Sequence, residues 1–129
     1  MTWLVRSAMC DLMPAVDGMP GVADTDIDGF LAQVRRETTF IVWLTIVAGA
    51  AAYAAMPLLT VYIPLPSFLL PAGARARHAE LAFARAPYLP RQAMFLLKMY
   101  GCMCWGQHPS VRERLALAPY PADPGGFRA

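Results

Sequence analysis

The longest uncharged stretch of this sequence runs from Thr38 to Ala74, and it limits the folds that are open to the chain. Residues 39–56 are apolar on every side of a helix, and such a helix needs burial in protein or in lipid. Pro57 predicts a kink or an end to this helix. The prolines that follow favour extended chain, because each one removes a backbone donor and fixes a backbone angle. One strongly apolar helix, kinked near Pro57, is therefore predicted within residues 39–63.

This apolar segment fits two environments. Residues 39–56 are near the lower limit for a membrane span, and continuation through the kink to Ile63 would suffice. The prolines favour burial in protein instead, because the backbone groups that they free need partners. Arginines flank both ends of the segment, so the positive-inside rule gives no orientation. We expect a membrane-associated protein, either at the cytoplasmic face or exported together with a partner.

The composition indicates that this chain buries apolar surface outside its own core. Of 129 residues, 57% are hydrophobic and only 16% are charged. A small domain has much surface for its volume, so this balance favours burial against a partner or a bilayer. A net charge of +2 is too small to indicate nucleic-acid binding. The N-terminus lacks a basic stretch followed by an apolar run, so we expect no export signal of its own.

Helical periodicity on both sides of the apolar segment predicts an all-α fold of about five helices with proline-rich connections. Residues 1–117 are expected to form a single helical accessory domain. Residues 118–129 are rich in proline and glycine and are expected to form an extended C-terminal tail. The predicted helices cover residues 2–13, 26–37, 39–56, 73–86 and 89–105, with a further helical restart at 108.

The stretch DTDIDG, residues 24–29, begins as a calcium-binding EF-hand loop begins. The twelfth position of such a loop needs a bidentate glutamate, and Arg35 stands there instead. Helix capping explains the aspartates better, because carboxylates accept from the free amides of a first turn. We expect Asp24 or Thr25 to cap the helix. A capping box formed by Ser110 and Glu113 is predicted for the last helix.

The sequence offers little for catalysis. Three cysteines lack the spacing of a metal or haem site, and the two histidines occupy unrelated contexts. Electron transfer through Cys102, Cys104 and His108 is an alternative that this spacing argues against. His78 is expected to be solvated or interfacial. No catalytic, cofactor-binding or metal-binding residue is predicted in this chain.

Two stretches together resemble a known family. AMCDLMPAVDGMPGVADTDIDGFLAQV is similar to the start of small helical subunits that accompany bacterial flavoprotein dehydrogenases. LPSFLLPAGARARHAELAFARAPYLPRQAMFLLKMYGCMCWGQHPSVRERLAL is similar to the end of the same module. The module resembles the small subunit of gluconate 2-dehydrogenase and the N-terminal helical extension of long-chain alcohol oxidases. The apolar residues 39–70 depart from the family, where arginines often interrupt this region.

The resemblance implies a non-catalytic accessory subunit of a glucose–methanol–choline (GMC) type dehydrogenase. The larger partner subunit would hold FAD and oxidise an alcohol, sterol, terpenoid or sugar hydroxyl, while this chain would stabilise or tether it. An independent small membrane anchor or assembly protein is the alternative. The residues expected to contact the partner or a membrane are aromatic or leucine side chains of the apolar segment and the tail: Phe40, Trp43, Leu44, Tyr53, Leu58, Tyr62, Phe68, Tyr120 and Phe127.

Overall fold

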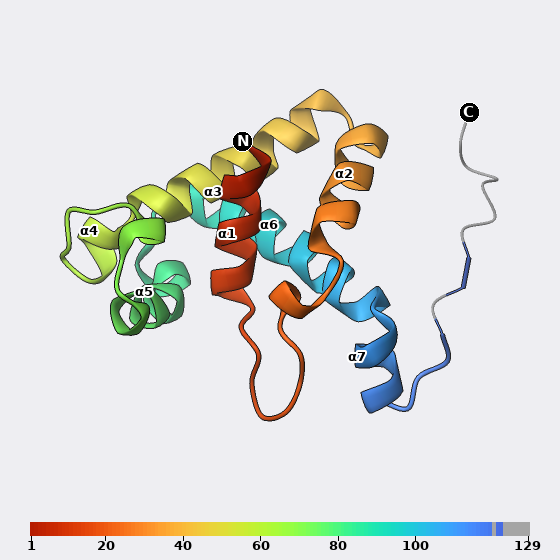
Figure 1. Ribbon diagram of the computed structural model, residues 1–129. Coiled ribbons are helices and arrows are strands. Elements are labelled where there is room, and N and C mark those ends of the chain that lie inside the picture. Colours follow the sequence, from red (N-terminus) through yellow and green to blue (C-terminus); the bar gives the residue numbers. More distant parts are fainter. Residues whose placement is uncertain (120, 123–129) are drawn as a thin grey trace.

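A computed structural model describes residues 1–119 and 121–122, and within this part of the chain the fold is entirely helical (Figure 1). This confirms the predicted all-α class. Seven α-helices and two short 3-10 helices are formed there, more than the five expected. The α-helices are α1 (Thr2–Leu12), α2 (Ile27–Glu37), α3 (Phe40–Ala55), α4 (Pro57–Thr60), α5 (Ala72–Arg85), α6 (Tyr88–Gln107) and α7 (Pro109–Arg114). The 3-10 helices are η1 (Val22–Asp24) and η2 (Ser67–Leu69).

The centre of the fold is the crossing of α3 and α6, which share more contacts than any other pair of elements. The two backbones meet at Gly49, where a methyl group would lie 2.4 Å from the carbonyl oxygen of Ala93. Helix α1 packs across α3 and closes the core from another side (Figure 1). The core side chains come from α1, α2, α3 and α6 and include Val5, Met9, Ile27, Leu31, Ile46, Ala50, Met94 and Leu97.

The apolar helix ends where the proline predicts. Helix α3 stops at Ala55, and Pro57 occupies the first position of the separate helix α4. Proline is well placed there, because the first turn of a helix leaves its amides unbonded. The continuous helix to Ile63 that a membrane span would require is not formed. Across the described residues, no helix combines the length and the apolarity that crossing a membrane needs.

The start of α2 corrects the predicted cap. Asp26 is the N-cap, and its Oδ1 accepts from the amide of Gly29 at 3.1 Å. Asp24 instead accepts from the amide of Gly21 at 2.8 Å, and the Thr25 hydroxyl donates to the carbonyl of Val22. Both residues therefore belong to the η1 turn that precedes the helix. The prediction had the right chemistry and placed it one or two residues too early.

The predicted capping box before α7 is wrong. His108 is the N-cap of α7, and Ser110 lies inside the first turn. The Ser110 hydroxyl lies 2.7 Å from Nδ1 of His108 and not on a backbone amide, so it forms no box with Glu113. Pro109 at the first helical position starts the helix two residues earlier than a cap at Ser110 would.

Candidate interaction surfaces

Helix α3 carries an exposed apolar stripe, which we define as Ile41, Leu44, Ala48, Ala51, Ala55 and, one turn further in α4, Leu58. The intervals between these residues alternate between three and four, so the five that lie in α3 share one face of that helix. All six are exposed, and Ile41 retains 74% of its surface. In Figure 1 the N-terminal half of α3 forms the upper edge of the molecule, away from α6. The α3 stripe therefore faces outward without a charged residue along it.

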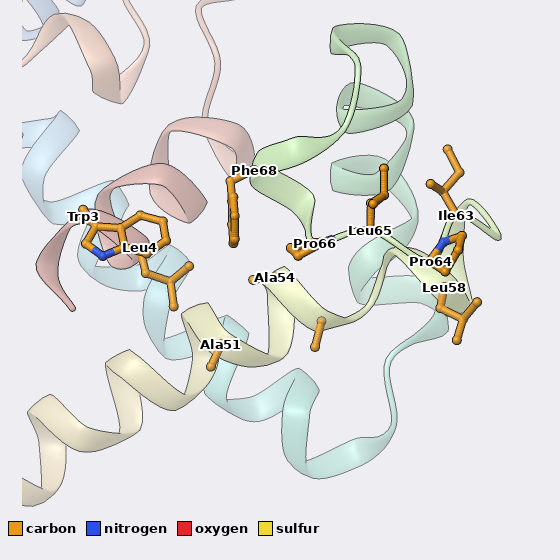
Figure 2. A pocket seen from close by; sticks show the side chains of 11 residues that line it. Trp3, Leu4, Ala51, Ala54, Leu58, Ile63, Pro64, Leu65, Pro66 and Phe68 are labelled. Carbon is orange, nitrogen blue, oxygen red and sulfur yellow. The ribbon is translucent and has the colours of Figure 1, made fainter.

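A groove of about 590 Å³ lies beside the C-terminal half of the α3 stripe (Figure 2). Its floor is alanine from α3, and its walls are α1 and the chain between α4 and η2. The rings of Trp3 and Phe68 meet edge to face, with their centroids 5.2 Å apart. The lining is almost wholly apolar: Trp3, Leu4, Ala51, Ala54, Ala55, Leu58, Ile63, Pro64, Leu65, Pro66 and Phe68.

A second apolar surface follows α6. We define the α6 stripe by its exposed large residues, Tyr88, Leu89, Phe95, Met99 and Met103. Met94, Leu97 and Cys104 lie on the opposite, buried face of α6. Phe95, Met99 and Met103 are exposed and form the continuous part of the stripe. Lys98 lies beside the stripe, with its ammonium 5.4 Å from the centre of the Phe83 ring.

Five of the predicted contact residues are exposed in the structure: Phe40, Leu44, Leu58, Tyr62 and Phe68. Trp43 is half-buried against the core. Tyr53 is a correction, because its side chain is completely buried and contacts no solvent. It faces α1 and α5, and an all-round apolar helix gives no sign of which residues turn inward. Tyr120 and Phe127 lie outside the described residues. Sequence reasoning missed Trp3 and Ile41, which lie on the same apolar region.

A buried histidine in α5 contacts α3 and α4. His78 is completely buried, which corrects its predicted exposure. Its Nδ1 lies 2.6 Å from the hydroxyl of Thr60, and its Nε2 lies 3.0 Å from the carbonyl oxygen of Tyr53. Because a carbonyl only accepts, Nε2 carries a proton and donates to Tyr53. Burial lowers the pKa of His78, which favours the neutral ring.

One sequence signal points to this burial. Ala82 and Ala86 follow His78 at intervals of four, on the inward face of α5 and just beyond its end, and both are buried. The Thr60 hydroxyl also lies 3.2 Å from the carbonyl oxygen of Met56. His78 therefore joins α3, α4 and α5 and fixes the side of the fold that carries the groove.

Next to His78, an acidic group from α1 enters the same region. Asp11 lies 3.8 Å from the guanidinium of Arg75, a long ion pair. Its Oδ2 and the hydroxyl of Tyr53 are both buried without a hydrogen bond within ordinary distance limits. The two groups still interact, and burial is the largest cause that raises the pKa of each. A carboxyl whose pKa is raised by burial disfavours its own charge, so this cluster does not stabilise the fold by ionisation.

The two cysteines of α6 differ in burial. Cys104 is buried, its sulfur lies 3.3 Å from the Thr25 hydroxyl, and burial raises its pKa. Cys102 is exposed, with its sulfur 3.8 Å from that of Met13. His108 binds Ser110. Within the described residues no group of three or more histidine, cysteine or acidic side chains has the arrangement of a metal site.

Comparison with known proteins identified no relative of this chain. No protein-family model, no curated protein and no solved structure matches the chain. The functional argument therefore rests on the two apolar surfaces and on the residues that shape them.

Proposed function

We propose that this chain is a non-catalytic accessory subunit that binds and stabilises a larger GMC-type flavin dehydrogenase subunit. The partner holds FAD and oxidises an alcohol, sterol, terpenoid or sugar hydroxyl. The resemblance described above names the partner class. The observation that carries the binding role is the exposure of large apolar side chains in continuous stripes on α3 and α6. Patches of this kind mark interaction sites.

The α6 stripe supports contact with a different protein. Aromatic residues and methionine are enriched at protein interfaces, and methionine adapts its shape to irregular surfaces. Phe95 retains 60% of its surface at the centre of the stripe. A shallow hollow beside it is lined by Phe83, Phe95, Lys98, Met99 and Cys102. This surface offers a central aromatic anchor with one charge at its edge, which suits a partner with an apolar patch and a nearby carboxylate.

The test is a pull-down of the tagged chain from its native host, with an absorption spectrum of the eluate. We expect a larger subunit to co-elute, with flavin absorption bands. The variant Phe95→Glu places a charge in the α6 stripe and should reduce recovery of the larger subunit at least tenfold. Leu44→Glu on the α3 stripe is the matched control, with a similar change in exposed side chain, and should leave that recovery unchanged.

Two outcomes would overturn the proposal. One is a colourless eluate that holds this chain alone. The other is equal recovery of the flavoprotein with wild type and with Phe95→Glu, which would leave the α6 stripe without a role in binding it.

Attachment to a membrane surface is a second candidate. It is favoured by Phe40, Ile41 and Leu44, which are exposed together directly after Arg35 and Arg36. Apolar residues beside cations bind the interface of anionic bilayers. Co-sedimentation with vesicles of anionic phospholipid would support this attachment, and loss of sedimentation in Leu44→Glu would assign it to the α3 stripe. A chain that stays in the supernatant would dismiss it.

A further inference from the structure

We infer that the α3 stripe is a self-complementary surface that pairs two copies of this chain, antiparallel, in a twofold-symmetric dimer. This goes beyond the proposed function, which assigns the larger subunit to the α6 stripe. The dimer is argued from the spacing of the stripe, from the sizes of its side chains and from the area that it offers.

The spacing of the stripe is that of a helix pair. Its positions within α3, 41, 44, 48, 51 and 55, alternate in steps of three and four, which is the seam of a coiled coil. Such a seam packs against another helix at a crossing angle of about 20°. The α3 stripe therefore predicts a helical occupant that lies along α3.

The sizes of the side chains select an antiparallel copy. The N-terminal half of the stripe is bulky, with Ile41 and Leu44 standing out from the helix. The C-terminal half is small, with Ala51 and Ala55 on the floor of the groove. A twofold axis near the middle of α3 brings the bulky half of each copy onto the small half of the other. An isologous interface requires this kind of match between a surface and itself.

One register pairs the central positions of the stripe. When Leu44 lies opposite Ala55 of the second copy, Ala48 lies opposite Ala51, and Ile41 extends beyond the end of α3 toward Leu58 in α4. The alanines in the middle let the backbones approach closely. Leu44 and Ile41 then enter the groove beside Ala55. A parallel pair would place Ile41 on Ile41 and leave both grooves empty.

The available area is that of a stable dimer. The large exposed side chains of this region are Trp3, Phe40, Ile41, Leu44, Leu58, Leu65 and Phe68, with exposed fractions between 37% and 77%. If a fully exposed large side chain presents about 200 Å², they offer on the order of 800 Å² before the alanines are added. A standard interface buries about 800 Å² on each partner.

Electrostatics do not oppose the pairing. The stripe has no charged residue, so the contact would bury no unpaired charge. The hydroxyl of Thr45, at the edge of the stripe, donates to the carbonyl of Ile41 and is already satisfied. Antiparallel helices also place the positive end of one dipole near the negative end of the other.

The first experiment measures the mass of the purified chain in solution by light scattering. We expect twice the chain mass of 14.1 kDa, and we expect Leu44→Glu to weaken dimerisation at least about 100-fold, since a charge would lie on the apolar seam. The matched control Phe95→Glu should remain dimeric. A wild-type monomer at micromolar concentration, or a Leu44→Glu variant that remains dimeric, would overturn the proposal.

Disulfide trapping tests the orientation. Copies that carry Cys102→Ser and Leu44→Cys are mixed with copies that carry Cys102→Ser and Ala55→Cys, under mild oxidation. We expect a disulfide between the two kinds of copy, because the register brings their β-carbons together. Cross-linking of Leu44→Cys copies among themselves would show a parallel pair and overturn the antiparallel assignment.

The two tests fail separately. Loss of the dimer with retained flavoprotein binding removes only this inference. A dimer that recovers no flavoprotein removes only the proposed function.

Discussion

The α3 stripe and the α6 stripe are both apolar, yet their side chains are organised differently. The α3 stripe changes from bulky to small along its length and ends beside a groove. The α6 stripe has aromatic and methionine side chains throughout, with Lys98 beside it. The size of the side chains changes along the α3 stripe. The α6 stripe is characterised instead by flexible methionine side chains and a nearby charge.

This difference shows why exposed apolar area alone does not identify a partner. A surface that contains its own complement fits a second copy of itself, whereas a surface of adaptable methionines fits a protein of another shape. Four substitutions follow that break or sharpen the comparison, in order of decreasing effect.

The largest effect is expected for Gly49→Ala, which breaks the packing that both surfaces share. The added methyl group would lie 2.4 Å from the carbonyl oxygen of Ala93, so α3 and α6 must separate. We expect the free energy of unfolding to fall by about 3 kcal/mol, because overpacking a core is destabilising by this order. Urea denaturation followed by circular dichroism measures the change.

Gly73→Ala is the control for this experiment. No atom lies within 4 Å of the added methyl group, near the start of α5. Its effect should be neutral or stabilising, because alanine favours helices over glycine. Equal losses for the two variants would contradict the importance of the α3–α6 approach.

His78→Ala should loosen the groove side of the molecule and spare the α6 stripe. The change removes the donor to the Tyr53 carbonyl and the partner of the Thr60 hydroxyl, which can still donate to Met56. An unsatisfied buried polar group costs about 1–3 kcal/mol, so we expect a loss of about 2 kcal/mol. Hydrogen exchange should accelerate in α4 and α5 more than in α6.

His78 also predicts a pH dependence. The pKa of His78 is lowered from its ordinary 6.5 because the ring is buried. Between the two pKa values the unfolded chain binds more protons than the folded one, so the free energy of unfolding falls as the pH falls below about 6.5. Above that pH the group contributes no slope. The difference between wild type and His78→Ala should shrink on acidification, and a difference that stays constant would contradict neutral burial.

Trp3→Ala acts on the wall of the groove. Trp3 meets Phe68 edge to face and keeps more than half of its surface exposed. We expect about a tenfold weaker dimer, which corresponds to about 1.4 kcal/mol, and little change in folding stability. Sedimentation equilibrium measures the first quantity and denaturation the second. Reduced recovery of the flavoprotein would show that the two surfaces are not independent.

The smallest effect is expected for Asp26→Ala, at the start of α2 and apart from both stripes. Loss of the hydrogen bond to Gly29 should cost about 1 kcal/mol. Dimerisation should not change. Ser110→Ala, which removes no helix cap, should lower the melting temperature less than Asp26→Ala does, and the reverse order would contradict the observed caps.

Local chemistry in the sequence predicted the helical class, the apolar character of α3 and its end at Pro57. The position of the α2 cap was predicted wrongly because four neighbouring residues have side chains that can cap a helix. The amide of Gly21 and the carbonyl of Val22, which form η1, decide which of them remain free. Hydrogen bonds across a turn therefore overrode a local preference.

The surfaces were harder to predict, because periodicity does not say which face of a helix meets the core. Leu44 and Leu58 were predicted as contacts and are exposed, whereas Tyr53 on the same apolar run is buried. His78 escaped prediction because its partner Thr60 lies 18 residues away in the chain. The groove depends on α1, α3 and the proline-rich connection together, which no single segment encodes.

Arg85, at the end of α5, holds the connection that forms the groove wall. Its guanidinium donates to the carbonyl of Thr60 at 2.9 Å and lies over the ring of Tyr62. The shortest hydrogen bond of this guanidinium is accepted by a backbone carbonyl oxygen, which every residue type provides. Substitution of Leu65, which lines the groove, would therefore leave this contact between Arg85 and the backbone in place. The shape of the groove and the chemistry of its lining can therefore be altered separately by substitution, which allows the fit to a bound helix to be tuned on an unchanged backbone.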